Sequence, residues 1–192
     1  MSIAGYVLAG GKNRRMNGEK KAFLTWKGEM FLNHVISAME SLEQIYLSVE
    51  AEEPYRQTAV PLVVDKYPET GPMGGIRSGL EICGEDALLV LPCDTPGITG
   101  KTVELLIRKY EETGKAVAAA AAGRIHPLAA VYTRDNLKEI ERMMAEKNYR
   151  MMALLESIEY DKADILNADE LMNINDNHQY MKLIERKWTQ GK

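Results

Sequence analysis

The chain has 192 residues, 45% of them hydrophobic and 27% charged, and its 24 basic and 28 acidic side chains give a formal net charge of −4 at pH 7. This mild acidity argues against a nucleic-acid partner bound through general basicity, and no apolar run approaches the ~18 residues of a membrane-spanning helix. The two cysteines, Cys83 and Cys93, lack metal-site spacing and lie in apolar runs, so we expect reduced thiols in a soluble, cytoplasmic protein without signal peptide or membrane contact.

Four short apolar runs in the first half of the chain have the length of β-strands. They cover residues 3–9, 45–49, 61–65 and 87–93. Each run is nearly continuous in apolar character, which is typical of strands buried on both faces of a parallel sheet. Between them, apolar residues recur at three- and four-residue spacing over 31–39, 76–83 and 103–110, as in amphipathic helices. This alternation predicts βαβ units and a helix-covered sheet.

The second half of the chain continues the pattern with weaker signals. We expect strands over 117–122 and 127–132, although the alanines of the first are poor strand formers. Helices are predicted from Thr133 through Met144, over 151–156 and over 176–187. Because no linker, charge block or repeat interrupts the chain, residues 1–192 are predicted to form a single α/β domain with a predominantly parallel sheet. Nothing in the pattern requires more than a monomer.

A glycine-rich basic loop directly follows the first predicted strand. It begins with Leu8, Ala9, Gly10 and Gly11, and five cations follow within ten residues: Lys12, Arg14, Arg15, Lys20 and Lys21. Adjacent glycines let backbone amides approach an anion, and a polyphosphate would compensate the mutual repulsion of the cations. A solvated basic loop is the alternative, but open α/β sheets bind ligands at the carboxyl ends of their strands. The spacing matches neither the Walker A nor the dinucleotide-binding motif.

Two aspartates follow other predicted strands. Asp94 closes the most hydrophobic run, where an unpaired charge is costly and Mg²⁺ would compensate it together with phosphate oxygens. The alternative is a turn- or helix-capping aspartate before Pro96. Asp65 ends another apolar run and allows the same two interpretations. Since both aspartates and the basic loop follow strand ends, they could face one ligand.

A third candidate is the run Gly71-Pro72-Met73-Gly74-Gly75, which opens a predicted helix. A helix N-terminus favours anions, but a plain turn followed by a helix cap explains the run nearly as well. His126, next to Pro127, fits a structural role better than a catalytic one, and no Ser/His/Asp set is evident. The chemistry therefore concentrates in the first half of the chain.

The order of these motifs resembles that of a known family. Leu8-Ala9-Gly10-Gly11, followed by Arg15-Met16 and Lys21, is similar to the LAGGxSxRMGxDK signature of nucleoside-triphosphate transferases. The further matches are Gly71–Gly75, Pro92-Cys93-Asp94-Thr95-Pro96, His126-Pro127 and Asn173-Ile174-Asn175. Together they resemble the molybdenum cofactor guanylyltransferases, a MobA-like nucleotidyltransferase family, nearly from end to end. The resemblance implies a Rossmann-like fold of the nucleotide-diphospho-sugar transferase type.

The resemblance also implies a reaction and its residues. The reaction would be the Mg²⁺-dependent transfer of GMP from GTP to the terminal phosphate of molybdopterin, with release of pyrophosphate. The nucleotide would be bound by Leu8, Ala9, Gly10, Gly11, Lys21, Asp65 and Asp94. Lys21 would neutralise charge on the triphosphate as the catalytic cation, and Asp94 would bind the metal. To these we add Arg15 as a second catalytic cation. The C-terminal third, including His126, residues 149–152 and Asn175, would bind the pterin, and proteins that receive the finished cofactor are implied as transient partners.

Departures from the family pattern leave two points open. Asn13 replaces the usual serine, and Lys20 stands where an aspartate commonly precedes the lysine. Lys20 and Lys21 therefore compete for the working role, although the spacing from the glycines favours Lys21. The asparagine that often follows the second strand is absent, because residues 48–50 are Ser-Val-Glu, so the choice between GTP and CTP stays open.

Three alternatives to a GTP-dependent enzyme remain. A CTP-dependent molybdopterin transferase is the nearest, because the loop motifs bind phosphates and say little about the base. A sugar-phosphate nucleotidyltransferase is disfavoured by the length of 192 residues, which leaves little room for a large sugar-binding addition. A non-enzymatic nucleotide-binding module is disfavoured by the presence of both Lys21 and Asp94.

Overall fold

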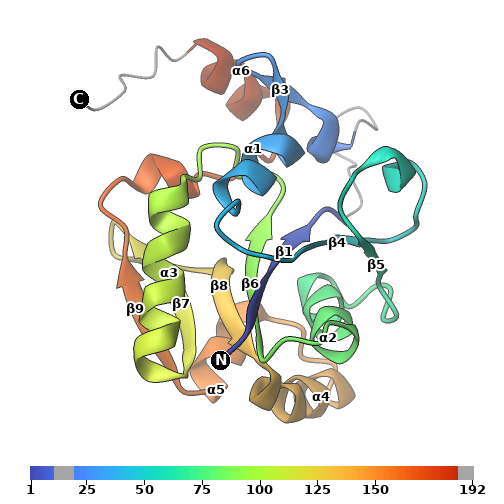
Figure 1. The fold of residues 1–192 in the computed structure, drawn as a ribbon, viewed down its shortest axis with the longest axis vertical. Coiled ribbons are helices and arrows are strands. Elements are labelled where there is room, and N and C mark those ends of the chain that lie inside the picture. Colours follow the sequence, from blue (N-terminus) through green and yellow to red (C-terminus); the bar gives the residue numbers. More distant parts are fainter. Residues whose placement is uncertain (11–19, 186–192) are drawn as a thin grey trace.

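The computed structural model describes residues 1–10 and 20–185, and its centre is a seven-stranded sheet (Figure 1). The strands are β1 (Ile3–Leu8), β4 (Ile45–Val49), β5 (Leu62–Val64), β6 (Ala87–Pro92), β7 (Ala116–Ala121), β8 (Arg124–Thr133) and β9 (Tyr160–Asp164). Their order across the sheet is β5-β4-β1-β6-β8-β7-β9. Only β8 runs antiparallel to its neighbours. The predominantly parallel sheet expected from the sequence is confirmed.

Helices cover both faces of the sheet. On one face lie α1 (Phe31–Ala38) and α3 (Gly100–Thr113), and on the other lie α2 (Pro72–Ile82), α4 (Leu137–Ala145) and α5 (Met151–Ser157). Each face has its own buried apolar cluster, because alternate residues of the strands point to opposite sides. Within the described ranges, no helix combines the length and the apolar character needed to cross a membrane.

A small group of secondary-structure elements packs together at one end of the molecule. It consists of the short hairpin β2 (Thr25–Trp26) and β3 (Glu29–Met30) and the last described helix, α6 (Asn177–Glu185). A third apolar cluster of Leu24, Trp26, Phe31, Ile174 and Leu183 holds these elements together. This cluster brings the C-terminal part of the chain to the segment that follows the basic loop, near the top of Figure 1.

The parallel strands end at a common edge, and this register positions the site. Leu8 of β1 pairs with Ser48 of β4 on one side and with Pro92 of β6 on the other. Val49 of β4 pairs with Val64 of β5. The residues that follow these four neighbouring strands therefore lie at the same edge of the sheet. This is the edge at which the sequence predicted the start of the glycine-rich loop, Asp65 and Asp94.

Helix α2 packs closely against β1 because it carries glycine where the two elements meet. A Cβ atom on Gly79 would lie 2.5 Å from Cζ of Tyr6 and 2.8 Å from Cδ1 of Leu88. The buried Tyr6 hydroxyl donates a hydrogen bond of 2.8 Å to the carbonyl oxygen of Gly75. These contacts fix the first turns of α2 relative to the end of β1.

The structure departs from the predicted elements in the second half of the chain. Strand β9 was not expected, because its sequence Tyr-Asp-Lys-Ala-Asp is polar and only Ala163 is buried, as suits an edge strand. Strand β8 begins at Arg124, three residues before the predicted start at Pro127, and its pairing with β7 is irregular between Ala118 and Ala119. That irregularity accommodates a proline, which cannot donate to a ladder.

Two helix ends also differ from expectation. Helix α2 begins at Pro72, before the apolar periodicity that predicted 76–83, because its first turn is built from Pro-Met-Gly-Gly. Helix α6 is described to Glu185, and the last two residues of the predicted range 176–187 lie outside the described residues. The helix predicted after Thr133 is preceded by a short 3₁₀ turn over Arg134–Asn136, with Thr133 as its cap.

Candidate active site

A cavity of about 880 Å³ opens at the common edge of β1, β4, β5 and β6, next to the N-terminus of α2. Its lining includes six of the eight residues predicted to form the site: Leu8, Ala9, Gly10, Lys21, Asp65 and Asp94. The other two, Gly11 and Arg15, lie outside the described residues. Open α/β sheets bind ligands at this position, because neighbouring connections diverge there and leave a crevice.

Lys21 forms the centre of the polar contacts in the cavity. Its Nζ donates hydrogen bonds of 2.7 Å to Oδ2 of Asp94 and of 2.7 Å to Oδ1 of Asn175. The Lys21 and Asp94 side chains are only 17% and 13% exposed, so the charges of this ion pair are partly removed from water. A lysine ammonium has three N–H donors, and the two contacts leave one donor for a ligand in the cavity.

The second carboxylate oxygen of Asp94 is available to a cation. Oδ1 is buried and has no hydrogen-bond partner among the described residues. In the same part of the chain, no group of three or more His, Cys, Asp or Glu side chains gathers around a common point. Asp94 alone could therefore supply one ligand to a divalent ion such as Mg²⁺, which characteristically takes one or two carboxylates and completes its shell with phosphate oxygens and water.

The segment after the last strand completes this end of the cavity. The Ile174 N–H donates a 2.8 Å hydrogen bond to the carbonyl oxygen of Asp94, and the Asn175 N–H donates to Oε1 of Gln179 at 2.6 Å. Ile174 is fully buried in the apolar cluster with α6. These anchors explain why Asn175 reaches Lys21 from a position 154 residues away.

The backbone from Leu8 to Gly10 is held on three sides. Cys93 N–H donates to the Leu8 carbonyl at 3.0 Å, and Ala9 N–H donates to the Ser48 carbonyl at 2.9 Å. The buried Tyr55 hydroxyl donates to the Ala9 carbonyl at 2.9 Å. Burial raises the pKa of the Cys93 thiol to about 12, followed in size by the Asp94 charge, so Cys93 is a neutral thiol beneath the cavity at physiological pH.

The two lysines that the sequence left in competition point to different places. Lys20 does not line the cavity, and its Nζ lies 5.2 Å from the centroid of the Tyr55 ring, within cation–π range. Lys21 lines the cavity and contacts Asp94. The geometry therefore distinguishes Lys21 from Lys20.

The N-terminus of α2 forms another wall of the cavity. Gly71, with φ +64°, precedes Pro72 in the first helical position, and no side chain caps the helix there. Gly71, Pro72 and Gly75 all line the cavity. A Cβ on Gly75 would lie 2.9 Å from Oγ of Ser48, so the helix approaches the end of β4 closely. The N-terminus of α2 gives this wall the positive end of the helix dipole.

Asp65 lines the cavity directly after the edge strand β5. Asp94, the partner of Lys21, follows β6, which lies three strands further along the sheet. Its Oδ1 accepts hydrogen bonds from the Tyr67 N–H at 2.8 Å and from the Ser78 hydroxyl at 3.1 Å. Glu50 lines the cavity beside it. The cavity thus has the Lys21–Asp94 ion pair at one end and the Asp65 and Glu50 carboxylates at the other. With a cation bound to Asp94, this arrangement matches a ligand that has an anionic group at one end and hydrogen-bond donors at the other.

The predicted acceptor residues are only partly brought to the cavity. Asn175 lines it, whereas His126 and residues 149–152 are absent from its lining, and Leu128 takes part from strand β8. Burial and the nearby Arg124 charge lower the pKa of His126, so this imidazole is neutral at physiological pH. The contact of Asn175 with Lys21 was missed, because the motif resemblance names Asn175 without saying what it touches. The contact of Ser78 with Asp65 was missed, because Ser78 carries no sequence signal of its own.

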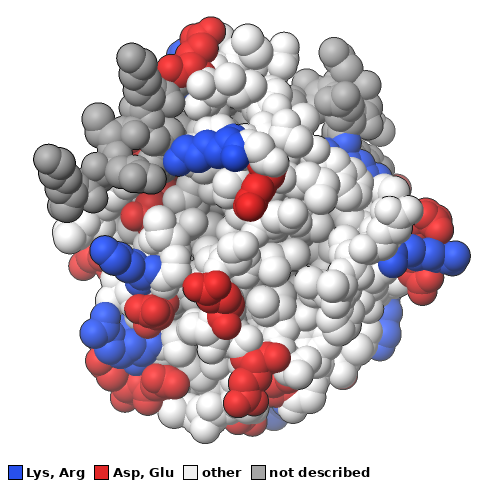
Figure 2. Space-filling model, turned by 45° about the horizontal axis from the view of Figure 1, so that its top comes forward, with Lys and Arg blue, Asp and Glu red and all other residues white. Residues whose placement is uncertain are grey.

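The surface charge is mixed on the face that Figure 2 shows. The Lys and Arg side chains of the described residues lie beside Asp and Glu or are separated by neutral surface, and they form no continuous basic area on this face. On this face the basic side chains of the described residues are therefore scattered and do not gather into one patch.

Comparison with known proteins identifies the family. The model of the MobA-like NTP transferase domain matches residues 5–163. The probable molybdenum cofactor guanylyltransferase of Bacillus cytotoxicus is 29% identical over 97% of this chain and 98% of its own length. The enzyme of the same name from Bacillus mycoides is 31% identical, over 93% of this chain and 94% of its own.

A solved structure agrees at the level of the fold. Molybdopterin-guanine dinucleotide biosynthesis protein A from Archaeoglobus fulgidus matches with a TM-score of 0.81 and 20% identity, covering 95% of this chain and 97% of that one. The likeness confirms the nucleotidyltransferase type of fold expected from the motifs. With a family model that spans most of the sequence and relatives matched nearly from end to end, the chain belongs to the MobA-like NTP transferase domain family.

Proposed function

We propose that this protein transfers GMP from GTP to the terminal phosphate of molybdopterin and releases pyrophosphate, with Mg²⁺ as the metal. The observation that carries the proposal is the contact of Lys21 with Asp94 and Asn175 at the end of the cavity, with Asp94 Oδ1 buried and unpartnered among the described residues. The names of the related proteins, molybdenum cofactor guanylyltransferases, supply the substrates.

The reaction is a nucleotidyl transfer at phosphorus. An oxygen of the molybdopterin phosphate attacks the α-phosphorus of GTP, and a new P–O–P bond forms. The bond between the α-phosphorus and the oxygen that bridges to the β-phosphate breaks, and its electron pair leaves with pyrophosphate. Such a transfer needs no covalent nucleophile from the protein, so positioning and charge compensation decide the rate.

The residues at the cationic end supply that compensation. Lys21 directs its remaining donor towards the triphosphate and stays fixed by Asp94 and Asn175. Asp94 would hold a divalent cation through Oδ1, and the bound cation would neutralise the charge that develops on the phosphate oxygens. The first turn of α2, which no side chain caps, adds the positive end of the helix dipole on a neighbouring wall.

The carboxylate end suits the nucleoside. Ribose hydroxyls and the amino and imino groups of a base are hydrogen-bond donors, and Asp65 and Glu50 offer only acceptors when ionised. Guanine presents two adjacent N–H donors on one edge, whereas cytosine presents one donor next to an acceptor. This complementarity favours GTP over CTP.

A nucleotide panel tests the proposal. GTP, CTP, ATP and UTP are each added to the protein with Mg²⁺ or with a chelator, and the shift of the unfolding temperature is measured. A ligand at 100 times its Kd adds about 2.7 kcal/mol of stability, so binding is readily detected. We expect the largest shift with Mg²⁺-GTP. A larger shift with CTP would reassign the base, and no shift with any nucleotide would refute nucleotide binding altogether.

A product assay then separates transfer from mere binding. Purified protein is incubated with GTP, Mg²⁺ and molybdopterin, and pyrophosphate and the dinucleotide product are quantified by chromatography. Equal amounts of both products are expected, because one transfer releases one pyrophosphate. Binding of GTP without either product would assign the protein as a nucleotide-binding module.

A further inference from the structure

The Asp65 side chain is oriented partly by Ser78, a residue that does not line the cavity. Asp65 follows β5, and its own N–H continues the ladder by donating to the Val49 carbonyl at 2.9 Å. Oδ1 accepts from the Tyr67 N–H at 2.8 Å and from Ser78 at 3.1 Å. Oδ2 makes no hydrogen bond with the described residues, although Asp65 lines the cavity. One oxygen is thus held by the protein, and the other is left for a ligand.

Ser78 is the only side chain of the described residues that contacts this carboxylate. It lies on α2 with no exposed surface. Its Oγ accepts a hydrogen bond of 3.0 Å from the Lys66 N–H, and it lies 2.9 Å from the Gly74 carbonyl oxygen as well as 3.1 Å from Asp65. A buried serine in a helix usually donates to the carbonyl four residues earlier, so the additional contacts need an explanation.

The Ser78 hydroxyl has one proton, and two acceptors lie within hydrogen-bond distance of it. The Gly74 carbonyl is a neutral acceptor within the helix, whereas Asp65 carries a negative charge when ionised. A hydrogen bond to an ionised acceptor is roughly twice as strong as one between neutral groups. Donation to Asp65, with acceptance from Lys66 N–H, therefore gives the most favourable arrangement. In it Ser78 holds both the carboxylate and the backbone that carries it.

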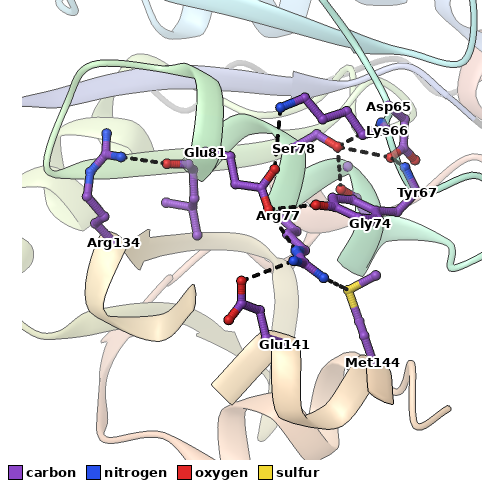
Figure 3. A network of polar contacts seen from close by, with 12 residues as sticks. Asp65, Lys66, Tyr67, Gly74, Arg77, Ser78, Glu81, Arg134, Glu141 and Met144 are labelled. Atoms are coloured by element: carbon purple, nitrogen blue, oxygen red, sulfur yellow. Dashed lines mark hydrogen bonds and ion pairs between the residues drawn. The ribbon is translucent and has the colours of Figure 1, made fainter. Parts of the chain in front are cut away.

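The same face of α2 anchors the corner that follows Asp65 (Figure 3). The Tyr67 hydroxyl donates to Oε1 of Glu81 at 2.7 Å, and Arg77 contacts the same oxygen at 2.8 Å. The Arg77 guanidinium lies 4.1 Å from the centroid of the Tyr67 ring. These contacts fix the corner to the helix without touching the Asp65 carboxylate, so its orientation depends on Ser78 and on the local turn.

We infer that Ser78 is a positioning residue for the nucleotide: its hydroxyl fixes Oδ1 of Asp65, so that Oδ2 faces the cavity and accepts a hydrogen bond from a hydroxyl or amino group of the nucleoside. This inference rests on the proposed function. Ser78 does not line the cavity and acts only through Asp65. Helix α2 then contributes twice to the site, since its first turn forms a wall of the cavity and its second turn orients the Asp65 carboxylate.

A double-mutant cycle tests the inference. The Kd of Mg²⁺-GTP is measured by calorimetry for wild type, Ser78→Ala, Asp65→Ala and the double variant. Ser78→Ala should raise Kd about three- to tenfold, and Asp65→Ala at least as much, as for hydrogen bonds that involve an ionised group. The double variant should bind like Asp65→Ala, because Ser78 has nothing left to orient. In steady-state kinetics, Ser78→Ala should raise KM for GTP and leave KM for molybdopterin unchanged.

Two further variants separate positioning from a structural role. Ser78→Cys keeps an unbranched side chain, slightly larger than serine, with a weaker donor and should raise Kd as Ser78→Ala does. Tyr67→Phe removes a hydroxyl that anchors the same corner to Glu81 and should leave Kd unchanged. Urea titrations establish that each variant is folded. The inference is overturned if Ser78→Ala weakens binding equally with and without Asp65, if Ser78→Cys binds like wild type, or if Tyr67→Phe weakens binding as much.

The same measurements keep the inference apart from the proposed function. If wild-type protein binds no nucleotide, the proposed function fails and the inference falls with it. If wild-type protein binds Mg²⁺-GTP and Asp65→Ala binds equally well, only the inference fails, because the carboxylate that Ser78 holds is then not a ligand.

Discussion

Replacing Lys21 by methionine, which is unbranched like lysine, one atom shorter and uncharged, should abolish most of the transferase activity. The ammonium makes two contacts of 2.7 Å, to Asp94 and Asn175, and Lys21 lines the cavity, so its third N–H is left for a ligand. The substitution leaves the cavity volume nearly unchanged. It therefore isolates the charge and its hydrogen bonds from the shape of the site.

The size of the expected loss in kcat follows from how close the Lys21 ammonium lies to the charge on the triphosphate. Two unit charges about 4 Å apart interact by about 4 kcal/mol at an effective dielectric constant of about 20. Part of this attraction already exists with bound GTP, so we assign about 2.7 kcal/mol to the transition state, which corresponds to a loss of about 10²-fold in kcat. The free energy of unfolding should fall by about 1–3 kcal/mol, because Asp94 loses its partner at 13% exposure.

The assay compares Lys21→Met with Lys20→Met under saturating GTP and Mg²⁺. Lys20 is the matched control, because it carries the same charge on the adjacent residue and its Nζ lies over the Tyr55 ring. We expect less than about a threefold change for Lys20→Met, because its Nζ makes a cation–π contact with Tyr55 and does not line the cavity. Equal losses for both variants, or a harmless Lys21→Met, would show that the local contacts do not identify the working lysine.

Other predictions concern the metal, the packing and a buried thiol. Asp94→Asn should abolish the extra thermal shift that Mg²⁺ gives with GTP, because an amide replaces the charged oxygen; an undiminished Mg²⁺ effect would place the metal elsewhere. Gly79→Ala should lower the free energy of unfolding in urea by about 2 kcal/mol or more, because its Cβ would lie 2.5 Å from the rigid Tyr6 ring. The Cys93 thiol, whose pKa burial raises from 9.0 to about 12, should resist alkylation at pH 8 until the chain unfolds. Since the folded state disfavours the thiolate, the free energy of unfolding should fall between pH 9 and 12, and less steeply in Cys93→Ala.

The strands that are buried on both faces of the sheet were predictable from the sequence. Strands β1 and β6 are apolar throughout, because both of their faces are covered by helices, and this pattern is legible without a structure. Strand β9 could not be predicted from the apolar pattern, because an edge strand needs few apolar residues and only Ala163 of β9 is buried. The early start of β8 was hidden by Pro127, which sits at an irregular part of the pairing with β7.

The candidate site was predictable to the extent that it lies at strand ends. Asp65 and Asp94 follow apolar runs directly, so their common edge followed from the parallel sheet. Asn175 was named only through the family resemblance, as a pterin contact, and its contact with Lys21 depends on how Ile174 is buried beneath it. Ser78 could not be found, since a serine on the inner face of a helix is indistinguishable by pattern from one that bonds its own backbone.

The contact between Lys21 and Asn175 spans 154 residues, and it places a condition on how the protein is made. At about 5–20 residues per second, the ribosome needs roughly 8–30 s to synthesise the chain between these two positions. During that interval the nascent chain can pair its first strands, but Lys21 has neither protein anchor until Asp94 is made, 73 residues after it, and only that one until Asn175 follows. The site is therefore finished after most of the sheet. A stop codon before Asn173 would yield a chain that retains all seven strands and lacks the asparagine that fixes the lysine.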